Sequence, residues 1–104
     1  MQEKRRHPRR LVRLPLRICP KDAEPIPGET VDLSVGGLFI NVVGGVSFGE
    51  ELEIELDLPD LGPTRLPAIV RWLRPEGFGV QFGLLGAKHT HALANLVDTI
   101  PLES

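Results

Sequence analysis

Apolar and polar residues alternate along most of this chain, with the two-residue period of a β-strand that has one buried and one solvent-exposed face. The alternation is strictest in residues 51–58, where four apolar residues alternate with four acidic ones. It also runs from Leu11 to Ile18, with Pro15 on the face opposite the apolar residues. Because proline cannot donate a hydrogen bond to a neighbouring strand, Pro15 predicts an edge or bulged strand.

Four further segments have strand-like patterns and are separated by turns rich in glycine and proline. They are residues 29–33, 38–43, 64–73 and 78–84. Residues 20–28 contain three prolines and one glycine, which predicts a loop. Six short strands with regular turns in so short a chain predict a barrel or a sandwich.

The apolar residues near the C-terminus change to the i, i+3, i+4, i+7 spacing of a helix with one apolar stripe. They are Leu93, Leu96, Val97 and Ile100. The pattern predicts a helix over 87–100, closed by Pro101, that covers one end of the barrel. We therefore expect a mostly β chain that forms a single domain over 1–104, with a flexible basic arm at 1–10 and the barrel at 11–85.

The net charge of −2 hides a strong asymmetry along the chain. The segment Lys4–Arg17 contains seven basic residues and no acid, whereas Glu50–Asp60 contains acids and no base. An anionic partner would therefore be met at the N-terminus. A lone cysteine, Cys19, fits a reducing compartment, and neither a membrane-spanning run nor a signal peptide is evident, so we expect a cytoplasmic protein without membrane insertion.

The basic arm is the first segment that could carry chemistry. Its guanidinium groups could form bidentate hydrogen bonds to phosphate oxygens and could stack on flat bases. A solvated tail that only aids solubility is the alternative. The cations concerned are Lys4, Arg5, Arg6, Arg9 and Arg10.

A polar turn follows the second predicted strand and contains Asp32, Ser34, Gly36 and Gly37. A carboxylate can accept hydrogen bonds from the edge of a guanine, and a hydroxyl can donate or accept. Glycine would let the backbone approach a ligand closely. The alternative is an ordinary Asx or Ser turn whose glycines serve only its conformation.

Trp72 is the only tryptophan of the chain. A base could stack on its indole, although a place in the core is the common role of a tryptophan. Arg71 and Arg74 could add positive charge beside it, or could simply form a solvated strand face.

Taken together, these motifs resemble the PilZ domain family. The arm contains RxxxR, and about two dozen residues later the chain contains DxSxxG. The later strands match the V-x-W and G-x-G-V-x-F patterns of the family. The matching residues are Arg5–Arg9, Asp32–Gly37, Val70–Trp72 and Gly77–Phe82.

The resemblance implies a six-stranded antiparallel β-barrel with a C-terminal helix that binds cyclic di-GMP, often as a stacked pair. By the same resemblance Arg5 and Arg9 hold phosphates and a guanine, Asp32 and Ser34 contact a guanine, and Gly37 keeps the loop close to the ligand. Arg6 and Arg10 also satisfy the RxxxR spacing. Lys4 stands where members of the family often carry a further arginine, which leaves the number of bound ligands open.

We therefore expect a cyclic di-GMP receptor or adaptor, without a cofactor and not an enzyme, in which ligand orders the arm and changes the surface offered to an unidentified downstream protein. One alternative is a PilZ-type adaptor that acts through proteins without binding nucleotide. Another is a small basic barrel that binds single-stranded nucleic acid, although the few aromatic residues argue against it. His89 and His91 diverge on a helix, so no metal site is expected.

Overall fold

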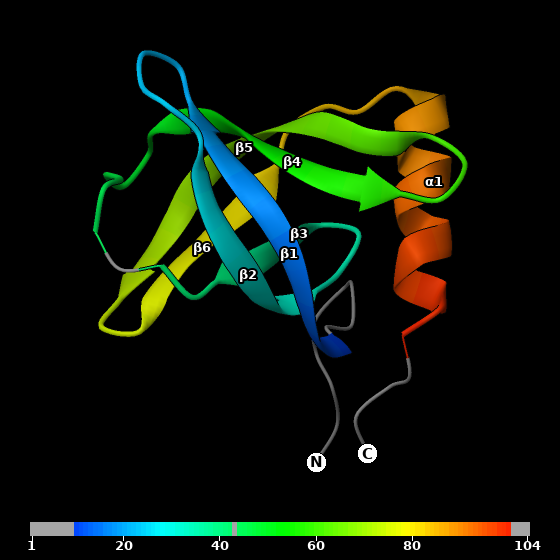
Figure 1. The fold of residues 1–104 in the computed structure, drawn as a ribbon, viewed down its shortest axis with the longest axis horizontal. Helices are drawn as coiled ribbons and strands as arrows, with labels where there is room; N and C mark the ends of the chain where they lie inside the picture. Colours follow the sequence, from blue (N-terminus) through cyan, green and yellow to red (C-terminus); the bar gives the residue numbers. More distant parts are fainter. Residues whose placement is uncertain (1–9, 43, 101–104) are drawn as a thin grey trace.

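The computed structural model of the protein describes residues 10–42 and 44–100. Within them the chain forms six strands and one helix (Figure 1). In chain order these elements are β1 (Arg10–Pro20), β2 (Ile26–Leu33), β3 (Gly37–Ile40), β4 (Glu51–Leu58), β5 (Gly62–Arg74), β6 (Gly77–Phe82) and α1 (Ala87–Asp98). No helix in this part of the chain is long and apolar enough to span a membrane.

The six strands close into one barrel in the order β1-β2-β3-β6-β5-β4, with β4 paired back to β1. Every neighbouring pair is antiparallel. The predicted six-stranded antiparallel barrel with a C-terminal helix is therefore confirmed. The alternation read from the sequence explains its closure, because each strand contributes one apolar face to a shared interior.

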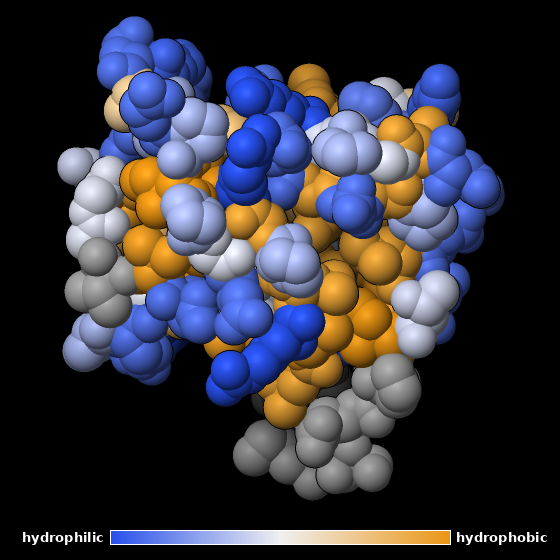
Figure 2. Space-filling view, viewed as in Figure 1, coloured by the Kyte–Doolittle hydropathy of each residue, from blue (hydrophilic) through white to orange (hydrophobic). Residues whose placement is uncertain are grey.

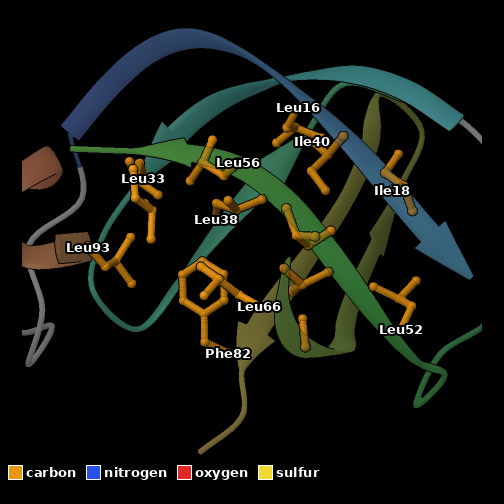
Figure 3. Packing of buried hydrophobic residues seen from close by; sticks show 14 of the residues in the cluster. Leu16, Ile18, Leu33, Leu38, Ile40, Leu52, Leu56, Leu66, Phe82 and Leu93 are labelled. Carbon is orange, nitrogen blue, oxygen red and sulfur yellow. The ribbon is translucent and has the colours of Figure 1, made fainter. Parts of the chain in front are cut away.

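The core fills the inside of the barrel and extends to the helix (Figure 3). The leucines and isoleucine of β4 are almost completely buried, while the acids between them lie on the outer side. Leu93 points from α1 toward the barrel side chains and is only 1% exposed. The helix lies beside β4 (Figure 1), and hydrophobic surface is visible between it and the front strands (Figure 2).

Pro15 lies in a part of β1 that has a ladder partner on one side only. It pairs with Glu29 of β2, whereas the pairing of β1 with β4 begins at Arg17. The register with β2 also shifts between Leu11 and Leu14. The prediction of an edge or bulged strand around Pro15 is thus confirmed even though the barrel is closed.

Several predicted element boundaries were wrong. The loop expected at 20–28 is shorter, because β2 already begins at Ile26 and Gly28 pairs with Leu16 of β1. A Cβ on Gly28 would lie 2.9 Å from a methyl group of Val42, so this glycine serves close packing rather than a turn. The third strand, the sixth strand and the helix end earlier than expected, at Ile40, Phe82 and Asp98.

Candidate ligand-binding site

Five strands each contribute one residue to a row across the outer side of the barrel, which we call the outer row. The register pairs Leu11 with Asp32, Asp32 with Phe39, Phe39 with Gly79, and Gly79 with Trp72. Leu11 and Trp72, at the two ends of the row, are 58% and 39% exposed. The row thus brings residues from distant parts of the sequence to one level of the barrel.

Two bulges place the functional side chains of this row on the outside. Thr30 and Val70 are fully buried, and strict alternation would point residues two positions later into the core as well. Each strand instead contains one extra residue, so the register shifts between Thr30 and Asp32 and between Val70 and Trp72. The shifts direct Asp32 and Trp72 outward, which is a known use of β-bulges beside binding sites.

The carboxylate of Asp32 is held against the neighbouring strand. The backbone N–H of Phe39 donates to Asp32 Oδ1 at 3.2 Å. The hydroxyl of Thr30 donates to the backbone carbonyl of Asp32. These bonds fix both the backbone and the side chain of Asp32 against the backbone of Phe39.

The turn that follows β2 uses the hydroxyl of Ser34 for its own structure. Ser34 Oγ accepts from the N–H of Gly36 at 3.1 Å and lies 3.3 Å from the carbonyl oxygen of Gly37, to which it can donate. The backbone N–H of Ser34 donates to the same carbonyl at 2.9 Å. Ser34 is only 5% exposed, so the alternative of a Ser turn describes its position in this structure well.

Gly37 is required by the barrel itself. A Cβ at this position would lie 2.1 Å from the carbonyl oxygen of Val80, which no real side chain tolerates. Gly37 therefore allows β3 to pair closely with β6. The neighbouring Gly36 accepts a hydrogen bond from the N–H of Phe82, which ties the turn to the end of β6.

Trp72 is neither in the core nor fully exposed. Its indole packs on the backbone of Gly79, where an added Cβ would lie 2.6 Å from Trp72 Cε3 and 3.4 Å from Phe39 Cδ2. Gly79 is buried although it lies on the outer side, because these rings cover it. Phe39 and Gly79 were missed in the sequence analysis; the only signal was the G-x-G pattern opposite the V-x-W pattern.

Of the cations in the arm, only Arg10 lies within the described residues; Lys4, Arg5, Arg6 and Arg9 lie outside them. Arg10 pairs with the inward-facing Leu33, and its side chain is 20% exposed. Its Nη1 donates to the carbonyl oxygen of Ile100 at 2.7 Å, and its Nη2 lies 4.0 Å from Asp98. The guanidinium of Arg10 is therefore engaged by the end of the helix.

A surface cavity of about 540 Å³ lies elsewhere on the barrel, with Cys19, Glu53 and Arg65 among its lining residues. Its arginine already has acidic partners, since Arg65 bonds to Glu55 at 3.3 Å and lies 3.9 Å from Glu53. This cavity does not favour an anionic ligand. Within 10–42 and 44–100 the structure contains no cluster of three or more His, Cys, Asp or Glu residues that could hold a metal ion.

The family comparison matches nearly the whole chain. The model described as "PilZ domain" matches residues 3–98. No match was found among the curated proteins.

Solved structures share the fold. The inhibitor of motility MotI/DgrA of Bacillus subtilis has a TM-score of 0.72 and 23% identity, over 94% of this chain and 51% of that one. This chain thus spans about half of that protein. The PilZ domain of CeSA from a cellulose synthesizing bacterium gives 0.73 and 20%, over 88% and 95% of the two chains. The PilZ domain of YcgR from Escherichia coli, solved with c-di-GMP, gives 0.75 and 14%, over 94% and 92%.

Proposed function

Because the chain belongs to the PilZ domain family, we propose that it is a receptor for the bacterial second messenger cyclic di-GMP. The similar structures of YcgR and of MrkH from K. pneumonia are complexes with this ligand, which supports the proposal. The proposal makes the chain a binding protein rather than an enzyme.

One observation carries the proposal: the register pair between Leu11 and Asp32. Leu11 follows the RxxxR motif by two positions, and Asp32 is the first residue of DxSxxG. The pair therefore supports a site at one end of the outer row to which both motifs, far apart in the sequence, contribute.

The chemistry of the arm and the outer row together suits a cyclic dinucleotide, which combines two phosphates with two flat guanines. We assign the phosphates and one guanine to Arg5 and Arg9, because guanidinium groups bond bidentately to phosphate oxygens and stack on bases. The Asp32 carboxylate would accept from the N1–H and N2 amine of a guanine. The half-exposed indole of Trp72 offers a surface on which a guanine could stack, and such stacking contributes substantially to affinity.

Other residues of the arm and the turn complete the proposed site. Lys4 and Arg6 would add positive charge, and the backbone of Gly36 and Gly37 would face the ligand across the turn. The engagement of Arg10 by Ile100 and Asp98 favours Arg5 and Arg9 over Arg6 and Arg10 as the RxxxR pair that binds ligand.

We also propose that the bound ligand holds residues 4–9 against the turn and so creates a new surface for a downstream protein. MotI is described as an inhibitor of motility, so motility is one output to test. Amide hydrogen exchange should show greater protection of residues 4–9 when cyclic di-GMP is present. Equal protection with and without ligand would contradict this part of the proposal.

Calorimetric titration with cyclic di-GMP, GTP and a short oligonucleotide tests the receptor function. We expect saturable binding of cyclic di-GMP alone, weakened by about tenfold or more in Arg9→Ala and in Asp32→Ala, because each loses charge-assisted hydrogen bonds. Lys21→Ala and Asp57→Ala are controls, since each removes the same charge from an exposed position away from the outer row.

The other outcomes favour the alternatives. Absence of any heat with a folded barrel, as judged by circular dichroism, would favour an adaptor that binds no nucleotide. Tighter binding of the oligonucleotide with a steep salt dependence would favour a nucleic-acid-binding protein. The described residues include only two aromatic side chains with large exposure, Phe48 and Trp72, which is few for such a surface.

A further inference from the structure

We propose that Gly79 is a positioning residue for ligand binding: it touches no ligand, but its missing side chain lets the indole of Trp72 lie against β6 beside Phe39. The proposal rests on the receptor function proposed above. It assigns to the second glycine of the G-x-G pattern a role in affinity.

The bulge at Arg71 makes a small residue opposite Trp72 necessary. In a regular strand Trp72 would face inward, because it lies two positions after the inward-facing Val70. The bulge instead directs Trp72 outward and pairs it directly with Gly79. Directly opposed residues on antiparallel strands have Cβ atoms only about 5 Å apart, so a large ring can lie flat there only if its partner is small.

The distances show that the indole uses this space. An ideal Cβ on Gly79 would lie 2.6 Å from Trp72 Cε3, well inside the ordinary contact distance between carbons. An alanine would therefore push the indole outward by roughly 1 Å. The φ angle of Gly79 does not lie in the left-handed region, so the backbone itself accepts alanine. The indole is therefore the part that must move.

The position of the indole matters for binding because a stacking surface works best when it is fixed before the ligand arrives. One side of Trp72 packs on Gly79, whereas the side chain as a whole is 39% exposed. Packing on one side removes rotational freedom that binding would otherwise have to remove. A displaced and more mobile indole would bind the same base more weakly.

The first measurement uses protein without ligand. Trp72 is the only tryptophan and the chain has no tyrosine, so intrinsic fluorescence reports on this indole alone. Gly79→Ala should increase quenching by acrylamide and shift the emission to longer wavelength. Gly83→Ala is the matched control, because its added Cβ would meet its nearest neighbour, Pro67, at an ordinary 3.6 Å.

The second measurement is a double-mutant cycle on the affinity for cyclic di-GMP. Gly79→Ala should weaken binding by about tenfold, within the range found when a stacked base loses its aromatic partner. In the Trp72→Ala background the same substitution should change the affinity by less than about twofold, because Gly79 acts through the indole. The double variant also removes the clash, so it folds even if Gly79→Ala alone does not.

The outcomes separate this proposal from the receptor function. Wild-type binding with an unchanged affinity in Gly79→Ala would overturn the positioning role alone, as would equal losses in the wild-type and Trp72→Ala backgrounds. A wild-type protein that binds no cyclic di-GMP would overturn the receptor function, and the role of Gly79 in affinity with it.

Discussion

The guanidinium of Arg10 donates a hydrogen bond from Nη1 to the backbone carbonyl oxygen of Ile100, 2.7 Å away. This bond joins the first residue of β1 to the segment that follows α1. Carbonyl groups at the end of a helix have no partner within the helix, and a cation nearby is favourable. The last residue of the basic arm, Arg10, therefore also stabilises the end of the helix.

Replacing Arg10 should loosen the helix end and destabilise the protein. We expect Arg10→Ala to lower the free energy of unfolding by about 1.5 kcal/mol, because it removes a partly buried hydrogen bond from a charged donor. The contact with the exposed Asp98 should contribute little. Urea denaturation measures the total, and amide exchange near Ile100 locates it. The control Arg13→Ala, at a 76% exposed side chain, should stay within about 0.5 kcal/mol of the wild type.

Replacing Ser34 distinguishes a turn-forming hydroxyl from one that contacts ligand. Ser34→Ala removes the acceptor of the Gly36 N–H, so we expect a loss of about 1 kcal/mol in stability and faster amide exchange at Gly36. The affinity for cyclic di-GMP should fall less than in Asp32→Ala. Unchanged stability together with a large loss of affinity would instead place the hydroxyl on the ligand.

Gly37 should tolerate no side chain, with or without ligand. Gly37→Ala would force a Cβ against the backbone of Val80, so we expect the free energy of unfolding to fall by about 3 kcal/mol. Thermal and chemical denaturation without ligand test this. Gly83→Ala serves as the control, because its added Cβ would meet its nearest neighbour, Pro67, at an ordinary 3.6 Å. Near-wild-type stability of Gly37→Ala would contradict the close pairing of β3 with β6.

Glu55 should make the stability of the barrel sensitive to acid. Hydrogen bonds from Arg17 and Arg65 lower the pKa of Glu55 below its ordinary 4.5, although partial desolvation opposes them. A carboxyl whose pKa is lower in the folded state stabilises the protein above the unfolded-state pKa, and this contribution is lost as the pH falls through the folded-state pKa. Glu55→Gln should therefore flatten the dependence of unfolding free energy on pH below about 4.5. An identical slope in both proteins would contradict the prediction.

The strict alternation of β4 was enough to predict its bounds and its buried face, because both depend on local pattern. The bulges were not predictable in the same way, since a register shift depends on which strand pairs with which. For that reason the outward direction of Asp32 and Trp72, and the contribution of Phe39, became clear only in the barrel. Arg10 was grouped with the arm by charge alone, but its contact with Ile100 joins residues 90 positions apart.

Closure of the barrel also limits how a partner protein can bind. Each described strand has a hydrogen-bonded neighbour on each side over part of its length, so most of its backbone groups are already used, although the stretch of β1 before Arg17 pairs with β2 alone. A partner therefore has no full-length sheet edge on which to add a strand, and the same property helps to protect the barrel from edge-to-edge aggregation. We expect recognition to depend mainly on side chains, turns and the helix surface, which substitutions can change without altering the hydrogen bonds of the barrel.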